Sequence, residues 1–275
     1  MTMATSEAGK QSNWDHSSNP EFLDYYGARS LLPETVNRFT SVRDKCLALL
    51  VGSGHPPTGA LEVVDIGCGA GTQCRLWASL GHRVHGLDVN APIIEVARQR
   101  AREAKLDIDF EVGSATALPY ADGSMDVSLL PELLEHVTDW ETCLEEAVRV
   151  LRPGGLLYIS TTNWLCPIQE EFTLPLYSWY PGFLKRHYER LAVTTRPEIT
   201  NHAKYPAVHW FSYYQLASWL EQRGFRCFDR FALIETEQMS WMKRAAVGLL
   251  RAFPPARLAG HALTSYSVVF ALRQC

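Results

Sequence analysis

Hydrophobic positions recur along the chain with two alternating spacings. Short apolar runs, typical of buried strands, occur at 61–66, 83–89, 108–112, 125–130 and 156–162. Segments with helical spacing lie between or beside them, at 34–50, 72–80, 91–104 and 140–151. Strands that alternate in this way with helices predict βαβ units built around a parallel sheet.

The alternation changes after residue 163. Residues 164–211 are rich in aromatic residues and proline, and they fit no simple βα unit. A helix is expected again at 212–225, followed by two last strands at 226–235 and 265–273. We therefore expect four segments. They are an N-terminal tail with a helix (1–33), a regular α/β core (34–163), an insertion (164–211), and a C-terminal part of the core (212–275) with a basic amphipathic insertion at about 240–262.

Composition narrows the class of protein. With 275 residues, 47% of them hydrophobic, the chain can fill a sizeable core, and a net charge of −4 argues against nucleic acid as a partner. The seven cysteines form no CxxC pair and no zinc spacing, which favours reduced thiols in a cytoplasmic protein. We expect neither a signal peptide nor a membrane span, because no apolar run approaches ~18 residues.

A glycine-rich turn follows the first predicted strand, in the stretch VVDIGCGAG at 63–71. Gly67, Gly69 and Gly71 have the spacing GxGxG, whereas the dinucleotide fingerprint requires GxGxxG, and residue 72 is threonine. Such a turn lets the backbone approach a nucleotide closely, but its spacing argues against NAD.

Two acidic residues flank this turn. Asp65 ends the first strand, where a carboxylate repels a pyrophosphate and suits a ligand with a positive amino group. Asp88 closes the second strand about twenty residues on, where a carboxylate accepts both ribose hydroxyls. Together these residues describe an adenosine joined to an amino acid.

With these features the chain resembles the class I S-adenosylmethionine-dependent methyltransferases, over about 36–162 and 212–272. The stretches LPYADGSMDVSLLPELLEHVTD and LRPGGLLYIST are similar to the family's fourth strand with its following turn, and to its fifth strand. The resemblance implies an α/β, Rossmann-like, seven-stranded sheet. That sheet is mostly parallel with its last strand antiparallel, carries helices on both faces, and has a lid insertion after strand five.

The resemblance also implies S-adenosylmethionine as the cofactor. The residues expected to contact it are Arg43, Asp65, Gly67, Gly69, Gly71, Asp88, Val89, Ser114, Ala115, Leu130 and Pro131. Ser114 stands where many members have an aspartate that accepts from the adenine amino group, and an uncharged hydroxyl is a weaker acceptor.

The turn after the fourth strand carries the candidate catalytic residues Glu132, Glu135 and His136. If a helix begins here, their i, i+3 and i+4 spacing places them on one face. The group is similar to that of the ubiquinone-pathway O-methyltransferases. The spacing of Arg38 and Arg43 in the first helix is similar too, and the resemblance implies that an arginine there clamps the methionine carboxylate. It also implies a divalent metal such as Mg²⁺ on the three residues of the turn, which would depress the pKa of an acceptor hydroxyl. A metal-free His136 that acts as base or substrate contact, and a purely structural turn, remain alternatives.

The resemblance also places the acceptor under elements outside the common sheet. Candidates for a roof over an apolar or aromatic acceptor are residues 13–31 and 164–211. Their aromatic residues are Trp14, Phe22, Tyr25, Tyr26, Trp164, Phe172, Tyr177, Trp179, Tyr180, Phe183, Tyr188, Tyr205, Trp210 and Phe211. His187, His202 and His209 could add a base from the same segments. The alternative for the aromatic residues is a small satellite core, and the alternative for the histidines is a packing or surface position.

Residues 241–253 form the basic amphipathic part of the last insertion. Met242, Ala245, Ala246, Leu249 and Phe253 lie on one side of a helical wheel, and Lys243, Arg244 and Arg251 lie on the other. Such a helix is typical of peripheral contact with an anionic membrane. Packing on the domain, or in a homodimer, is the alternative.

The sequence thus predicts a methyltransferase of a small, largely apolar or aromatic molecule, with a hydroxyl oxygen as the expected acceptor atom. N- or C-methylation of a metabolite remains open. RNA methylation and a non-catalytic cofactor-binding partner protein are weaker alternatives.

Overall fold

A computed structural model describes residues 27–53, 59–169, 171–200 and 207–274. Within this part of the chain, one sheet has the strand order β3-β2-β1-β4-β5-β7-β6. The strands are β1 (Glu62–Ile66), β2 (Arg83–Asp88), β3 (Asp109–Val112), β4 (Met125–Pro131), β5 (Leu151–Thr162), β6 (Phe225–Phe228) and β7 (Tyr266–Arg273). The first five strands are parallel, and β7 runs antiparallel to both β5 and β6.

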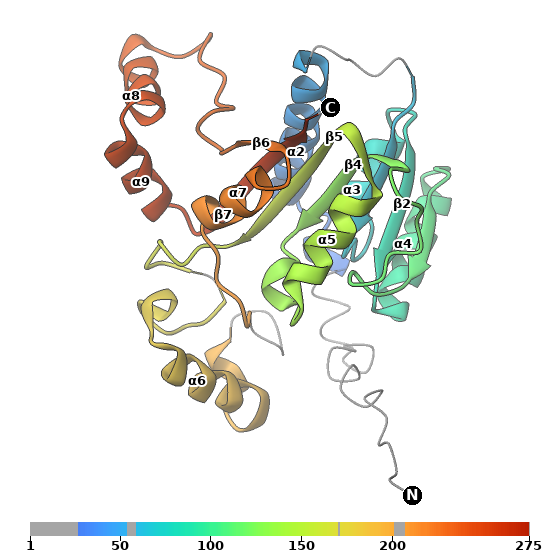
Figure 1. Ribbon diagram of the computed structural model, residues 1–275. Helices are drawn as coiled ribbons and strands as arrows, with labels where there is room; N and C mark the ends of the chain where they lie inside the picture. The colour runs from blue at the N-terminus through green and yellow to red at the C-terminus, as the bar shows by residue number, and fades with distance from the viewer. Residues whose placement is uncertain (1–26, 54–58, 170, 201–206, 275) are drawn as a thin grey trace, which may run out of the picture.

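Helices cover both faces of this sheet (Figure 1). On one face lie α2 (Pro33–Gly52), α3 (Thr72–Ala78) and α4 (Ala91–Glu103), and on the other lie α5 (Trp140–Val150) and α7 (Tyr213–Glu221). Side chains at helical spacing produce this packing: Cys143, Leu144, Ala147 and Val150 of α5 are all fully buried. The fold class is therefore as the sequence predicted.

Capping residues set where the helices begin. Asn90, Asp139 and Ser212 each accept a hydrogen bond from the backbone N–H three residues on, which starts α4, α5 and α7. Because α4 follows β2 and α5 follows β4, these caps also fix where the loops at the carboxyl edge of the sheet end.

Two strands differ from their predicted bounds. β6 ends at Phe228 rather than at 235, because the buried Asp229 turns the chain and accepts from the Ala232 N–H. β5 begins at Leu151 rather than at 156. Leu151 pairs with Met125, and the register shift before the next pair, Val127 with Leu156, accommodates Gly154 and Gly155 as extra residues of β5.

The insertion after β5 has a small core of its own. It contains the short 3₁₀ helices η5 (Tyr177–Trp179) and η6 (Pro197–Ile199) and the helix α6 (Gly182–Thr194). Phe172, Tyr177 and Ala192 are buried in it. Figure 1 shows α6 beyond the edge of the sheet, below the strands.

The second insertion forms two consecutive helices, α8 (Trp241–Ala252) and α9 (Pro254–Ala262). They stand out from the sheet on the side of β6 and β7 (Figure 1). None of the helices in the described ranges is sufficiently long and apolar to traverse a bilayer.

Candidate functional site

The glycine turn lies at the carboxyl end of β1, next to that of β4. Gly67 and Gly71 have φ angles of 75° and 73°, which L-residues rarely adopt. A Cβ on Gly67 would come within 2.8 Å of Leu133 Cδ1, and one on Gly71 within 2.8 Å of Phe110 Cζ. The turn therefore needs glycine for its backbone conformation and for its close packing.

Asp88 holds this turn against the end of β2. Its Oδ2 accepts from the Gly69 N–H and its Oδ1 from the Asn90 N–H, both at 2.9 Å. Burial raises the pKa of Asp88, and hydrogen bonds from these backbone amides oppose the rise. Each carboxylate oxygen keeps a second lone pair, so the residue can still accept from two ribose hydroxyls.

Asp65 is 1% exposed and lies beneath the turn. The Cys74 thiol donates to its Oδ2 at 3.3 Å, whereas its Oδ1 is buried and has no partner among the described residues. Burial raises the pKa of Asp65 to about 7. A buried acceptor of this kind fits the ammonium group of an amino-acid ligand, since a nearby positive charge would restore the ionised form.

The adenine side of the predicted site is more open. Val89 is 53% exposed, and the Gly113 N–H donates to the Asp88 carbonyl at 3.0 Å. The Ser114 hydroxyl already interacts with the hydroxyl and the N–H of Thr116. Ala115 is buried at 8% exposure. Val89 thus offers an apolar surface, while Ser114 is occupied by its own turn.

At the end of β4, Leu130 is fully buried and packs in the core between the sheet and α5. Its side chain therefore belongs to the core, and it can reach a ligand only through its backbone. Pro131, the next residue, is half-buried at the edge of the sheet.

The two arginines of α2 lie in different surroundings. Arg43 donates to the Leu76 carbonyl at 3.1 Å and pairs with Asp44, away from the glycine turn. Arg38 pairs with Glu132 at the carboxyl end of β4. Of the two arginines indicated by the sequence, Arg38 therefore lies beside the turn after β4, and the contact of Arg43 with the cofactor stays a prediction.

The turn after β4 is not the first turn of an α-helix, which corrects a prediction from the sequence. Glu132 has a φ of 54°, and its N–H donates to the Ser160 carbonyl of β5. Only the short 3₁₀ helix η4 (Leu134–His136) follows. Because of this backbone conformation, Glu132 points to Arg38 and does not share a face with Glu135 and His136.

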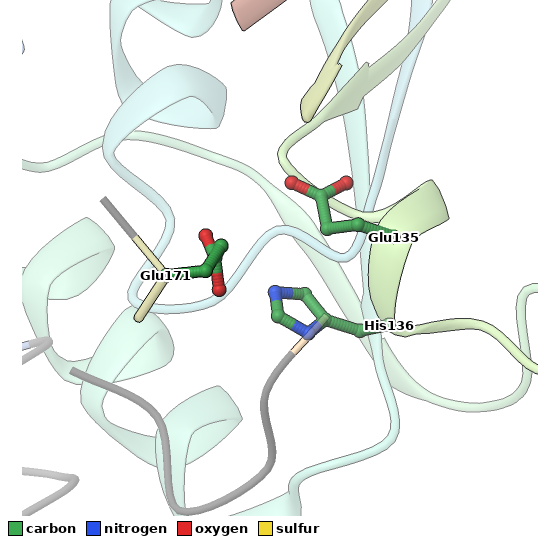
Figure 2. Close-up of side chains that lie close together, drawn as sticks. All are labelled: Glu135, His136 and Glu171. Atoms are coloured by element: carbon green, nitrogen blue, oxygen red, sulfur yellow. The ribbon is translucent and has the colours of Figure 1, made fainter. Parts of the chain in front are cut away.

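Glu135 and His136 instead meet Glu171, from the insertion after β5 (Figure 2). One ligand atom from each of the three side chains lies within 4.8 Å of the others. Glu135 is 1% exposed; its Oε2 accepts from the Thr161 hydroxyl at 2.7 Å, while its Oε1 is buried without a partner in the described structure. Burial, and then the charge of Glu171, raise the pKa of Glu135 well above its ordinary value.

Sequence reasoning missed Glu171. No local spacing links it to the motif after β4, because 34 residues including all of β5 separate it from His136. The chain after β5 brings it back over the carboxyl edge of the sheet. We call Glu135, His136 and Glu171 the carboxylate–histidine cluster.

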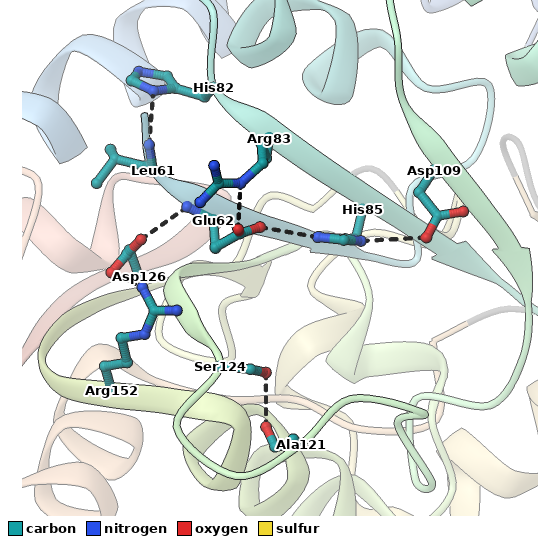
Figure 3. Close-up of polar contacts among 10 residues, drawn as sticks. All are labelled: Leu61, Glu62, His82, Arg83, His85, Asp109, Ala121, Ser124, Asp126 and Arg152. Atoms are coloured by element: carbon teal, nitrogen blue, oxygen red, sulfur yellow. Dashed lines mark hydrogen bonds and ion pairs between the residues drawn. The ribbon is translucent and has the colours of Figure 1, made fainter. Parts of the chain in front are cut away.

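Polar side chains also gather at the opposite edge of the sheet (Figure 3). Glu62 pairs with Arg83 and His85, and His85 also contacts Asp109 at 3.4 Å. Burial alone would raise the pKa of Glu62, but the hydrogen bonds from His85 and Arg83 outweigh burial and lower it. The group joins the starts of three strands and is structural.

Most aromatic residues of the predicted roof pack on one another. The rings of Phe172 and Tyr177 stack at 3.9 Å, and Tyr180, Tyr188 and Trp210 complete the same cluster. Phe211 belongs to the main core. The more exposed aromatics of this insertion are Trp164, Trp179 and Phe183. The packed residues therefore form a satellite core rather than a roof over the acceptor.

Part of the predicted roof falls outside the described residues, namely Trp14, Phe22, Tyr25, Tyr26, His202 and Tyr205. Of the two other histidines, His187 contacts the ring edge of Tyr188, and His209 Nε2 lies 3.1 Å from the Thr138 carbonyl oxygen. Neither belongs to the carboxylate–histidine cluster.

Comparison with known proteins agrees with this geometry. Residues 64–159 match the family model of a methyltransferase domain. A ubiquinone biosynthesis O-methyltransferase of Brucella ovis is 40% identical over 148 residues, which cover 52% of this chain and 57% of the relative. One of Chelativorans is 40% identical over 107 residues, covering 39% of this chain and 42% of the relative. The chain thus spans about half the length of the curated relatives it matches.

Solved structures support the fold alone, because their sequences are distant. The plantazolicin methyltransferase BpumL, in complex with SAH, has a TM-score of 0.59 at 14% identity and covers 94% of this chain and 92% of its own. An S-adenosylmethionine-dependent methyltransferase from Mesorhizobium loti has a TM-score of 0.50 at 19% identity, covering 82% and 96%.

Proposed function

We propose that the protein is an S-adenosylmethionine-dependent methyltransferase that methylates a hydroxyl oxygen of a small, largely apolar or aromatic acceptor. The match of residues 64–159 to the family model of a methyltransferase domain supports the reaction class. The single observation that carries the choice of oxygen is the carboxylate–histidine cluster, one strand away from the glycine turn. An oxygen acceptor needs a group that removes its proton, and this cluster can supply one. The names of the curated relatives add support.

The cofactor supplies a methyl group already activated by a sulfonium. The chain's own residues bind the cofactor and orient it toward the acceptor. Asp88 accepts from the ribose hydroxyls, and Asp65, buried beneath the turn, holds the positive amino group through the backbone or a bridging water. Gly67 and Gly71 keep the backbone free of Cβ atoms where the ligand and the core meet. Alignment of the two reactants at this edge accounts for much of the acceleration.

His136 is the proposed base. A ring nitrogen takes the proton from the acceptor hydroxyl as that oxygen bonds to the methyl group, which leaves an imidazolium. Glu171 and Glu135 lie within reach of this ring, and a carboxylate there stabilises its positive charge. Proton transfer by a positioned side chain contributes about 10²–10⁴-fold to a rate.

A more specific version of the proposal is that the same three residues bind a divalent cation such as Mg²⁺. Two carboxylates and an imidazole offer oxygen and nitrogen ligands, and Glu135 Oε1 has no partner in the described structure. Such an ion, when bound, lowers the pKa of a coordinated hydroxyl. In that case the three side chains hold the ion, and His136 is a ligand rather than the base.

The test is incubation with labelled S-adenosylmethionine and a panel of phenols, catechols and aliphatic alcohols, followed by mass spectrometry of the labelled product. We expect an O-methyl product, and a loss of at least about 100-fold in turnover in His136→Ala. His85→Gln, in the structural group at the opposite edge of the sheet, is the matched control. Full turnover in His136→Ala, or label only on nitrogen or carbon, would overturn the proposal. Loss of activity with a chelator, restored by Mg²⁺, supports the cation; unchanged activity excludes it.

A further inference from the structure

The helix α8 packs with its apolar side turned away from the protein. Trp241, Met242, Leu249 and Phe253 lie within one half of the helical wheel and are between 52% and 77% exposed. Only Val247 of this helix is buried. An amphipathic helix normally does the reverse, because burying its apolar stripe provides the stabilisation.

The opposite side of α8 meets the body through Val247, which is buried, and Arg251. Arg251 donates to the carbonyl oxygens of Phe231 and Ala232, both at 3.0 Å. Arg244 and Arg251 flank Val247 at helical spacing, and Arg244 donates to the carbonyl of Met239 at 3.4 Å. These contacts fix which side of the helix faces out.

The next helix, α9, is anchored to the body through Asp229, and its outer side extends the apolar surface of α8. Asp229, fully buried, accepts from Arg257 at 2.7 Å and lies 3.0 Å from His261 Nε2. On the outer side Pro254, Pro255 and Leu258 line a shallow apolar hollow with Tyr214 of α7. Leu263, just after α9, is 84% exposed. The two helices together, Trp241–Ala262, are called the α8–α9 hairpin below.

The charge of the α8–α9 hairpin indicates which kind of partner binds its apolar surface. The chain carries a net charge of −4, yet from Gln238 to Gln274 it contains basic residues and no aspartate or glutamate. In the hairpin Lys243 and Arg244 are exposed, whereas Arg251 donates to carbonyl oxygens of the body and the charge of Arg257 is balanced by Asp229. A positive, apolar surface with an exposed tryptophan matches an anionic lipid interface. In a two-fold contact with a second copy of this chain, the basic residues beside the stripe would face the same basic residues of the copy, and like charges repel.

We propose that the α8–α9 hairpin docks the protein on an anionic bilayer surface. The apolar stripe inserts among the headgroups, and Lys243 and Arg244 stay at the level of the lipid phosphates. This inference is independent of the acceptor, because it rests on the exposure, orientation and charge of the hairpin alone.

Sedimentation of the full chain with vesicles tests this inference. We expect binding at low salt to vesicles of phosphatidylcholine mixed with phosphatidylglycerol, and little binding to phosphatidylcholine alone. The double substitution Met242→Glu with Leu249→Glu should reduce binding by more than about tenfold, because it places charge in the inserted stripe. Val51→Glu with Leu80→Glu is the matched control. It adds the same charge at two exposed apolar positions elsewhere and should leave most binding in place.

A single substitution separates the electrostatic part. Lys243→Gln should weaken binding about fivefold, and salt should weaken the wild type in the same direction. The inference fails if wild type does not bind anionic vesicles at low salt, if neutral vesicles bind as well, or if both double variants lose binding equally. It also fails if Met242→Glu with Leu249→Glu abolishes a dimer while vesicles bind neither protein. Methyl transfer to a water-soluble acceptor is a separate readout that these variants should not change.

Discussion

At the residue scale, the candidate site is marked by two buried carboxylates that each keep one oxygen without a partner in the described structure. They are Asp65 beneath the glycine turn and Glu135 in the carboxylate–histidine cluster. An unpaired buried polar atom costs about 1–3 kcal/mol. Both lie at the carboxyl edge of the sheet, where ligands bind in open α/β folds. Ligands with positive charge or with donors would remove this cost.

The pH dependence of stability tests the environment of Glu135. Burial raises its folded-state pKa above the unfolded value, so the group favours folding only below the unfolded pKa of about 4.3 and loses that contribution as pH rises. Relative to Glu135→Gln, the wild type should lose up to about 1.4 kcal/mol of unfolding free energy per pH unit above that value. Denaturant unfolding at several pH values measures this.

Glu141→Gln is the control, because it removes the same charge at an exposed position in the first turn of α5. Its stability curve should run parallel to that of the wild type. A parallel curve for Glu135→Gln as well would show that Glu135 ionises as an ordinary surface carboxyl does.

The arginines of α2 give a second prediction. Arg38→Ala should weaken binding of the demethylated cofactor at least about tenfold. Arg38 lies at the carboxyl edge, and hydrogen bonds to charged groups contribute about 1.5–3 kcal/mol. Arg43→Ala should change that affinity less than about twofold, since its guanidinium binds Leu76 and Asp44. Titration calorimetry measures both, and the opposite order would contradict this assignment and favour Arg43, the contact expected from the sequence.

The spacing of Glu132, Glu135 and His136 shows where sequence reasoning stops at this scale. It placed Glu135 and His136 together, but it assumed helical geometry for Glu132 as well. One left-handed residue, Glu132, redirects its side chain to Arg38. A long-range contact through Glu171 takes its place, and no periodic pattern encodes such a contact.

At the scale of elements, buried parallel strands appear in the sequence as apolar runs, as β1 and β4 do, whereas only Phe110 of β3 is buried. The bounds of β1 to β4 were all predicted to within one residue. The carboxyl end of β6 was not, because Asp229 looks like an ordinary polar residue within a strand. Only its partners, Arg257 and His261 from a helix about thirty residues later, explain why the chain turns there.

These partners make Asp229 the anchor of the α8–α9 hairpin. Hydrogen bonds from His261 and Arg257 outweigh burial and lower the pKa of Asp229. Its contribution is therefore present at neutral pH and is lost only as pH falls below the unfolded value. Asp229→Asn should reduce the unfolding free energy by about 3 kcal/mol, as the loss of a buried charge partner does.

Urea unfolding checks this value, and limited proteolysis should show earlier cleavage between 239 and 263. Asp122→Asn is the control, because it breaks an exposed pair with Arg149 and should cost less than about 0.5 kcal/mol. Equal losses in the two variants would mean that the buried group does not anchor the hairpin.

At the scale of the whole molecule, the sheet separates three regions. The glycine turn and the carboxylate–histidine cluster share its carboxyl edge, the structural group around Glu62 occupies the opposite edge (Figure 3), and the α8–α9 hairpin lies beyond β6 and β7 (Figure 1). The sequence predicted the first region through its motifs. The outward orientation of the hairpin could not be predicted, because an amphipathic pattern does not say which face meets the body.

The central claim is that the glycine turn, with Asp65 and Asp88, receives a sulfur nucleoside rather than a dinucleotide. Titration calorimetry of the full chain with S-adenosylhomocysteine and, separately, with NADH tests it most directly. The account predicts one S-adenosylhomocysteine bound per chain and no heat of binding with NADH. Binding of NADH, with no binding of S-adenosylhomocysteine or S-adenosylmethionine, would contradict it.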